Sequence, residues 1–263
     1  MFTKYSLASI FLLILISCHN SRHEGSKMKE GLGKEISFYT PDSLHIYGDL
    51  YDSNKKAPII LLFHQGGSNA RAEYGSIIPR LLEKGFNVLA TDQRMGGQYY
   101  GSYNRTLVHI SDHLYSNPYG FCDAYNNLES ALEYVLNKGY TDKIILWGSS
   151  YSATLAIQLA HKNQGVVDGV LAFSPAGGTP MKDCPSSLYF EDLEVPLLLL
   201  RPPSEMESEA VQNQFQLAQE KGHQVYAPRN GVHGSSMLVK ERVGADVSDT
   251  WKVVFNFLEE VTN

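Results

Sequence analysis

The chain has 263 residues, of which 43% are hydrophobic and 19% charged. That is enough for one sizeable core and rather short for two full domains. The formal net charge is −6 and no basic cluster stands out, which argues against binding to a phosphate backbone or broad attraction to anionic headgroups. We therefore expect one globular domain and no nucleic-acid partner.

The first 17 residues have the layout of a signal peptide. Lys4 lies in a short leading segment, and an apolar run follows from about Leu7 to Ile16. This run is too short to span a bilayer comfortably, and a polar stretch comes directly after it. We expect residues 1–17 to be removed from the mature protein.

Leu15 to Cys18 resemble the lipobox of bacterial lipoproteins. The resemblance implies cleavage before Cys18 and acylation of its thiol, so that the membrane is a partner through a lipid anchor. The protein would then lie in the cell envelope, on the periplasmic or outer-surface face of a membrane. An ordinary cleaved signal followed by an incidental cysteine is the alternative. We expect residues 18–33 to form a flexible tether and residues 34–263 to form the domain.

The remaining cysteines, Cys122 and Cys184, leave two interpretations open. An oxidising compartment would allow them to form one disulfide. They could equally be two buried free thiols, because cysteine is often a small core residue.

The domain begins with a predicted antiparallel hairpin. Residues 36–39 and 44–50 alternate apolar with polar side chains around the turn signal at residues 40–43. The later apolar runs are continuous and predict buried strands at residues 59–63, 86–90, 143–147, 166–173, 196–200 and 224–227. Helical spacing lies between or after them at residues 74–84, 123–137, 151–162, 207–221 and 248–260.

This alternation predicts an α/β fold with a mainly parallel central sheet and helices on both faces. Ligands of such sheets gather at the carboxyl ends of the strands. Residues 96–118 have no clear assignment, and we expect them to shape the entrance to a site. Their tyrosines could form a substrate wall or simply an exposed surface; they are Tyr99, Tyr100, Tyr103, Tyr115 and Tyr119.

A strand, a sharp turn and a helix are predicted around Gly148-Ser149-Ser150-Tyr151-Ser152. A turn this sharp needs small residues beside its central serine. The segment resembles the G-x-S-x-G nucleophile elbow of the α/β-hydrolase family, with Ser152 in place of the last glycine. The resemblance implies an α/β-hydrolase fold, Ser150 as nucleophile rather than Ser149 or Ser152, and the Tyr151 N–H as an oxyanion donor. A Gly/Ser-rich turn that caps a helix is the alternative.

The segment from Phe63 to Ser68 resembles the family's H-x-G-G oxyanion loop, which implies the Gln65 N–H as the second oxyanion donor. An ordinary strand-to-helix turn would also use glycines. We interpret His64, beside this loop, as structural. Asp92 and Arg94, which follow the next strand, are likewise expected to brace the site rather than to act in catalysis.

The family's order along the chain is serine, acid, histidine. In this order His233, on a glycine-flanked loop after the last predicted strand, is implied as the base. The acid is expected shortly after the strand at residues 196–200. Glu205 fits that position best, Glu207 is the alternative two residues on, and Asp183 is a more distant one.

Together these residues imply a serine hydrolase that cleaves a carboxylic ester of a small-molecule acyl substrate through an acyl-enzyme. Peptidase, amidase, thioesterase and lactonase chemistry are alternatives on the same fold, because fold alone does not decide among them. A non-catalytic lipoprotein that binds an envelope or glycan partner is a further alternative. No metal-ligand spacing and no phosphate-binding loop is found, so we expect no metal and no cofactor.

Overall fold

The computed structural model describes residues 33–110 and 119–263. The expected signal peptide, Cys18 and Tyr115 lie outside these residues. The strands are β1 (Lys34–Tyr39), β2 (His45–Tyr51), β3 (Ile59–Phe63), β4 (Asn87–Thr91), β5 (Ile144–Ser149), β6 (Gly169–Phe173), β7 (Leu197–Leu200) and β8 (Gln224–Tyr226). The helices are α1 (Ala70–Tyr74), α2 (Ile78–Glu83), α3 (Arg105–Val108), α5 (Tyr125–Asn137), α6 (Tyr151–Lys162), α7 (Glu209–Glu220), α8 (Lys240–Val243) and α9 (Ser248–Thr262).

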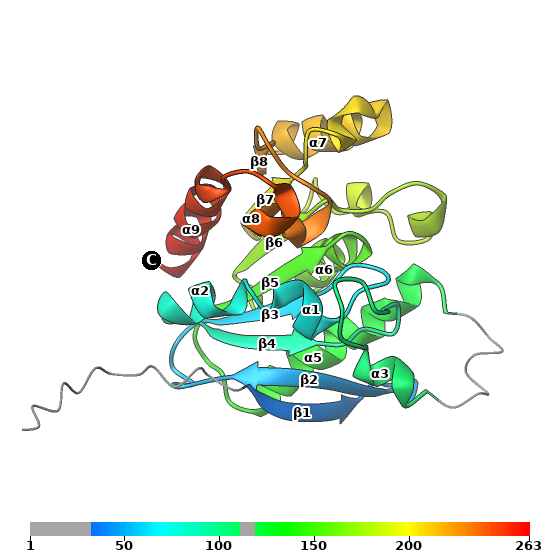
Figure 1. Cartoon of the computed structure of the whole chain (residues 1–263), viewed down its shortest axis with the longest axis vertical. Coiled ribbons are helices and arrows are strands. Elements are labelled where there is room, and N and C mark those ends of the chain that lie inside the picture. The colour runs from blue at the N-terminus through cyan, green and yellow to red at the C-terminus, as the bar shows by residue number, and fades with distance from the viewer. Residues whose placement is uncertain (1–32, 111–118) are drawn as a thin grey trace, which may run out of the picture. The chain divides into compact units, whose positions relative to one another are not determined.

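The eight strands form one sheet in the order β1-β2-β4-β3-β5-β6-β7-β8 (Figure 1). The pairs β1–β2 and β2–β4 are antiparallel, and all pairs from β4 to β8 are parallel. The predicted N-terminal hairpin and the mainly parallel sheet are both confirmed. The carboxyl ends of the parallel strands therefore meet at one edge, where the candidate site residues follow β3, β5, β7 and β8.

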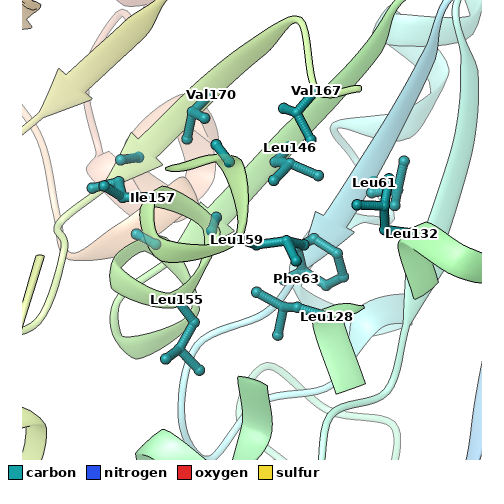
Figure 2. Packing of buried hydrophobic residues seen from close by; sticks show 14 of the residues in the cluster. Leu61, Phe63, Leu128, Leu132, Leu146, Leu155, Ile157, Leu159, Val167 and Val170 are labelled. Carbon is teal, nitrogen blue, oxygen red and sulfur yellow. The ribbon is translucent and has the colours of Figure 1, made fainter. Parts of the chain in front are cut away.

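Helices cover both faces of the sheet, and the central strands are therefore buried on both sides. Alternate residues of each strand enter opposite cores. Leu61 and Leu146 pack toward α5 and α6, whereas Leu62 and Trp147 pack toward α1, α2 and α9. Figure 2 shows the first of these cores from close by. Within the described ranges, no helix is both long enough and apolar enough to cross a membrane.

The prediction of a single helix over residues 74–84 is wrong. The structure has two short helices there, α1 and α2, separated by Gly75, Ser76 and Ile77. Pro79 is the second residue of α2. Its ring would clash with the carbonyl one turn earlier in a continuous helix, but the first turn tolerates it because no N–H partner is needed there.

The unassigned segment after β4 contains the short helix α3, which buried ion pairs hold against the sheet. Asp92 accepts a hydrogen bond from the Ala70 N–H at 2.8 Å and another from Arg105 Nε at 2.7 Å. Arg105 also donates to Asp49 at 3.0 Å. The structural role expected of Asp92 is confirmed.

Cys122 and Cys184 form a disulfide that links two segments 62 residues apart, with their Cα atoms separated by 5.9 Å. This resolves the two interpretations in favour of the disulfide. The bond fixes the short 3-10 helix Phe121–Ala124 to the segment that precedes β7.

Candidate active site

Ser150 lies at the turn between β5 and α6, with φ 61° and ψ −123°. This backbone conformation is rare for a residue with a side chain and costs of order 1–3 kcal/mol, so the surrounding structure must hold it in place. Gly148 makes the turn possible, because a Cβ atom there would lie 2.4 Å from the Ser152 carbonyl oxygen. The sequence thus forms the sharp elbow that the resemblance implies.

The hydroxyls of the neighbouring Ser149 and Ser152 form structural hydrogen bonds. Ser152 Oγ donates to the His64 carbonyl oxygen at 2.7 Å, and Ser149 Oγ accepts a hydrogen bond from the Ser235 N–H at 2.9 Å. Ser152 therefore replaces the family's glycine with a side chain that ties the elbow to the loop after β3. Of the three serines, Ser150 is the one that lines a cleft.

His233 directly precedes the 3-10 helix Gly234–Leu238, which is anchored at the strand ends. The Gly234 N–H donates to Ser174 Oγ at 3.0 Å, and Trp147 Nε1 donates to Ser235 Oγ at 2.9 Å. Sequence reasoning missed these anchors. They lie 60 and 88 residues from their partners, and no local pattern distinguishes them from other serines.

Glu205 is the acidic residue that contacts the His233 ring. His233 Nδ1 and Glu205 Oε1 are 2.5 Å apart, and Arg201 Nη1 donates to Glu205 Oε2 at 2.7 Å. Burial alone would raise the pKa of Glu205, but the hydrogen bonds from His233 and Arg201 outweigh it and lower the pKa. The alternatives Glu207 and Asp183 are exposed.

Ser150 and His233 line the same cleft of about 660 Å³. No hydrogen bond joins their side chains in the described structure, and catalytic pairs often tighten only when substrate binds. The rest of the lining is mainly glycine and apolar side chains: Gln65, Gly66, Gly67, Arg94, Met95, Gly96, Tyr99, Leu107 and Phe121. Of the tyrosines expected at an entrance, Tyr99 lines this cleft.

The structure does not support the Gln65 N–H as an oxyanion donor. That amide donates to Glu73 Oε2 at 2.9 Å, and Glu73 is fully buried. Burial raises the pKa of this carboxyl. The next amide, of Gly66, has no hydrogen-bond acceptor among the described residues, and Gly66 lines the cleft.

His64 has the structural role expected of it. The Gln93 N–H, which can only donate, contacts His64 Nε2 at 2.7 Å. The ring proton is therefore on Nδ1, which lies 2.7 Å from the Gln65 carbonyl oxygen and donates to it. A neutral, fully buried His64 thus links the loops that follow β3 and β4.

Arg94 forms a bidentate ion pair with Asp42, with N–O distances of 2.6 and 2.9 Å. Its Nε also donates to Asn127 at 2.7 Å. The hydrogen bond from Arg94 lowers the pKa of Asp42 to about 2. Arg94 thus braces the site, as expected, while forming part of the cleft wall. Across residues 33–110 and 119–263, no cluster of three or more potential ligands could hold a metal.

A family model described as the alpha/beta hydrolase fold matches residues 58–221. Among solved structures, the chain is similar to an esterase of Pyrococcus furiosus, at 17% identity and a TM-score of 0.65 over 88% of this chain and 92% of that one. It is also similar to Est1E of Butyrivibrio proteoclasticus with ferulic acid bound, at 11% identity and a TM-score of 0.64 over 86% and 98% of the chains.

An acylaminoacyl peptidase of Pyrococcus horikoshii has 15% identity and a TM-score of 0.61, over 89% of this chain and 42% of that one. At these identities the likeness concerns the fold. No curated protein is similar enough to count as a match. The family match covers more than half of the residues, so the chain belongs to the family of the alpha/beta hydrolase fold.

Proposed function

We propose that the protein is a serine hydrolase that cleaves carboxylic esters of small-molecule acyl substrates through a Ser150–His233–Glu205 triad. One observation carries the proposal. The strained serine of the elbow and a histidine that is paired with a carboxylate line the same cleft. The paired carboxylate fixes the ring with its proton on Nδ1, which leaves Nε2 to accept a proton from the serine.

In the proposed reaction, Ser150 Oγ attacks the ester carbonyl carbon while its proton passes to His233 Nε2. The tetrahedral intermediate then collapses, and the imidazolium gives this proton to the departing alcohol. Water, deprotonated by the same ring, next attacks the acyl-enzyme, and the imidazolium returns this proton to Ser150 Oγ as the acid is released. Glu205 stabilises the imidazolium formed in each step.

We propose the N–H groups of Tyr151 and Gly66 as the oxyanion donors. Tyr151 is the first residue of α6, so its N–H has no partner within the helix and lies at the positive end of the helix dipole. Gly66 replaces Gln65 in this role because the Gln65 amide is already bound to Glu73. Two donors aimed at the developing charge are the usual oxyanion arrangement.

Hydrolysis of p-nitrophenyl acetate and butyrate by the protein without residues 1–18 tests the proposal. We expect Ser150→Ala and His233→Ala to reduce kcat/KM by at least about a thousandfold. Glu205→Gln should reduce it strongly, whereas the matched variant Glu207→Gln should stay within about twofold. Hydrolysis that survives in Ser150→Ala would contradict the triad.

We also propose that Cys18 is acylated and anchors the domain in the cell envelope of a bacterium. The disulfide supports an oxidising compartment, because such bonds rarely persist in the cytosol. Incorporation of labelled palmitate by cells that express the full chain tests this. The label should be lost in Cys18→Ala, and its absence from the unchanged chain would contradict the anchor.

A further inference from the structure

Arg201 directly follows β7 and is almost completely buried, with 5% of its side chain exposed. It donates to Glu205 Oε2 at 2.7 Å, and its Nη2 contacts both the Pro175 carbonyl oxygen and Gln214 Oε1. The guanidinium therefore joins three separate segments. Its fork has fixed geometry, so these contacts hold it in one orientation.

The two oxygens of Glu205 are divided between two partners. Oε1 contacts the His233 ring and Oε2 contacts Arg201. Glutamate has one more rotatable bond than the aspartate that the family uses more often, so a free glutamate loses more side-chain entropy when it is held against a histidine. Glu205 also lies in a short 3-10 helix, Glu205–Glu207, which by itself restrains the side chain little. A second anchor on Oε2 removes this freedom.

The guanidinium also changes the electrostatic environment of His233. An arginine remains charged at neutral pH even when it is buried. Its positive charge lies against the Glu205 oxygen that does not contact the His233 ring. Among the described residues that line the cleft with His233, the charged one is Arg94, which forms an ion pair with Asp42.

We infer that Arg201 is a positioning residue of the proposed hydrolase site: it fixes Glu205 against His233 and places a buried positive charge on the second oxygen of that carboxylate. The inference rests on the proposed function, in which His233 is the base. It goes beyond the triad by assigning the acid's second oxygen to a specific buried cation.

The test compares two variants. Arg201→Gln removes the charge but keeps a hydrogen-bond donor, and Arg201→Lys keeps the charge but lacks the planar guanidinium with its several N–H donors. Both variants should lose about ten- to a hundredfold in kcat with KM changed less than about threefold. In Arg201→Gln the acidic limb of the kcat/KM profile should move to higher pH by about half to one unit. In Arg201→Lys the limb should stay near its original position. Lys143→Met, which removes a positive charge from the partly exposed pair with Asp168, is the charge-matched control and should leave the profile in place.

A measurement without turnover separates this inference from the proposed function. The His233 ring is titrated by NMR in the folded wild-type and variant proteins, with the signal assigned from His233→Asn and folding checked by thermal unfolding. A titration midpoint at higher pH in Arg201→Gln, but not in Arg201→Lys, supports the inference even if the wild type hydrolyses no ester. An unmoved midpoint in Arg201→Gln, or equal movement in both variants, overturns it even if Ser150-dependent hydrolysis is found. If Arg201→Gln does not fold, Arg201→Lys decides. A His233 midpoint that moves to higher pH although the charge is retained overturns the inference. An unmoved midpoint together with a reduced kcat supports it.

Discussion

The hydroxyl of Ser152 donates to the main-chain carbonyl oxygen of His64 over 2.7 Å, and both residues are fully buried. This bond joins the turn that carries Ser150 to the loop that carries Gly66. The serine that departs from the family pattern is thus a link between the two halves of the proposed oxyanion site.

We predict that Ser152→Ala lowers the free energy of unfolding by about 1–3 kcal/mol, because the buried carbonyl of His64 loses its donor. Urea unfolding measures the change. Thr262→Ala, which removes a partly buried hydroxyl bonded within the last helix, should cost under about 1 kcal/mol. Equal costs in the two variants would show that the link adds nothing to stability.

Gly148→Ala should prevent formation of the elbow. The added Cβ would lie 2.4 Å from the Ser152 carbonyl oxygen and 2.5 Å from the Ala153 Cα atom. Both contacts are backbone, which cannot rotate away as a flexible side chain could, and overpacking of this kind costs about 1–3 kcal/mol or more. Circular dichroism and ester hydrolysis measure the loss, and Gly177→Ala, where the added atom meets nothing within 4 Å, is the control. A stable, active Gly148→Ala would refute the close packing.

Loss of the disulfide should weaken both stability and substrate binding. In the chain-entropy account, a bond that closes a loop of 62 residues contributes about 4 kcal/mol. Cys122 is also adjacent to Phe121, which lines the cleft and packs on Tyr151 with ring centroids 5.0 Å apart. Cys122→Ser/Cys184→Ser should therefore unfold at lower urea concentration and show a higher KM. Two titratable thiols in the denatured but unreduced protein would contradict the disulfide.

The ionisation of Asp42 should make the free energy of unfolding depend on pH in the acidic range. Its pKa is about 2 in the folded protein against 3.8 for the free side chain, chiefly because of the hydrogen bond from Arg94. A lowered folded pKa contributes stability that is present above pH 3.8 and is lost as the pH falls through about 2. The carboxyl is partly exposed, so solvent screening reduces this contribution to about 1 kcal/mol. Urea unfolding between pH 5 and 2 should show a larger loss in the wild type and in Asp183→Asn than in Asp42→Asn, and parallel curves for all three would refute it.

The parallel strands were predictable because continuous apolar runs mark strands that are buried on both faces. The elbow was predictable for a similar reason, since a small-residue turn between a strand and a helix is a local pattern. Glu205 and His233 could be proposed from chain order, but only the fold brings them within 2.5 Å of each other.

The supporting residues were not predictable, because their partners are distant in the sequence. In the sequence, Glu73 looks like an ordinary polar residue of a surface helix. In the structure it is buried and accepts a hydrogen bond from the Gln65 N–H. This single contact moves the proposed oxyanion donor by one residue, to Gly66. Arg201 similarly follows a strand with no motif around it, and its role comes from three segments that meet only in the folded chain.

The central claim is that Ser150 is an activated nucleophile, and a fluorophosphonate probe tests it most directly. The protein lacking residues 1–18 is treated with the probe, digested and examined by mass spectrometry, with Ser150→Ala as control. We predict one adduct, on the peptide that carries Ser150, and none in the control. Folded wild-type protein that hydrolyses esters but carries its adduct on another residue, or that takes up no probe at all, would contradict the account.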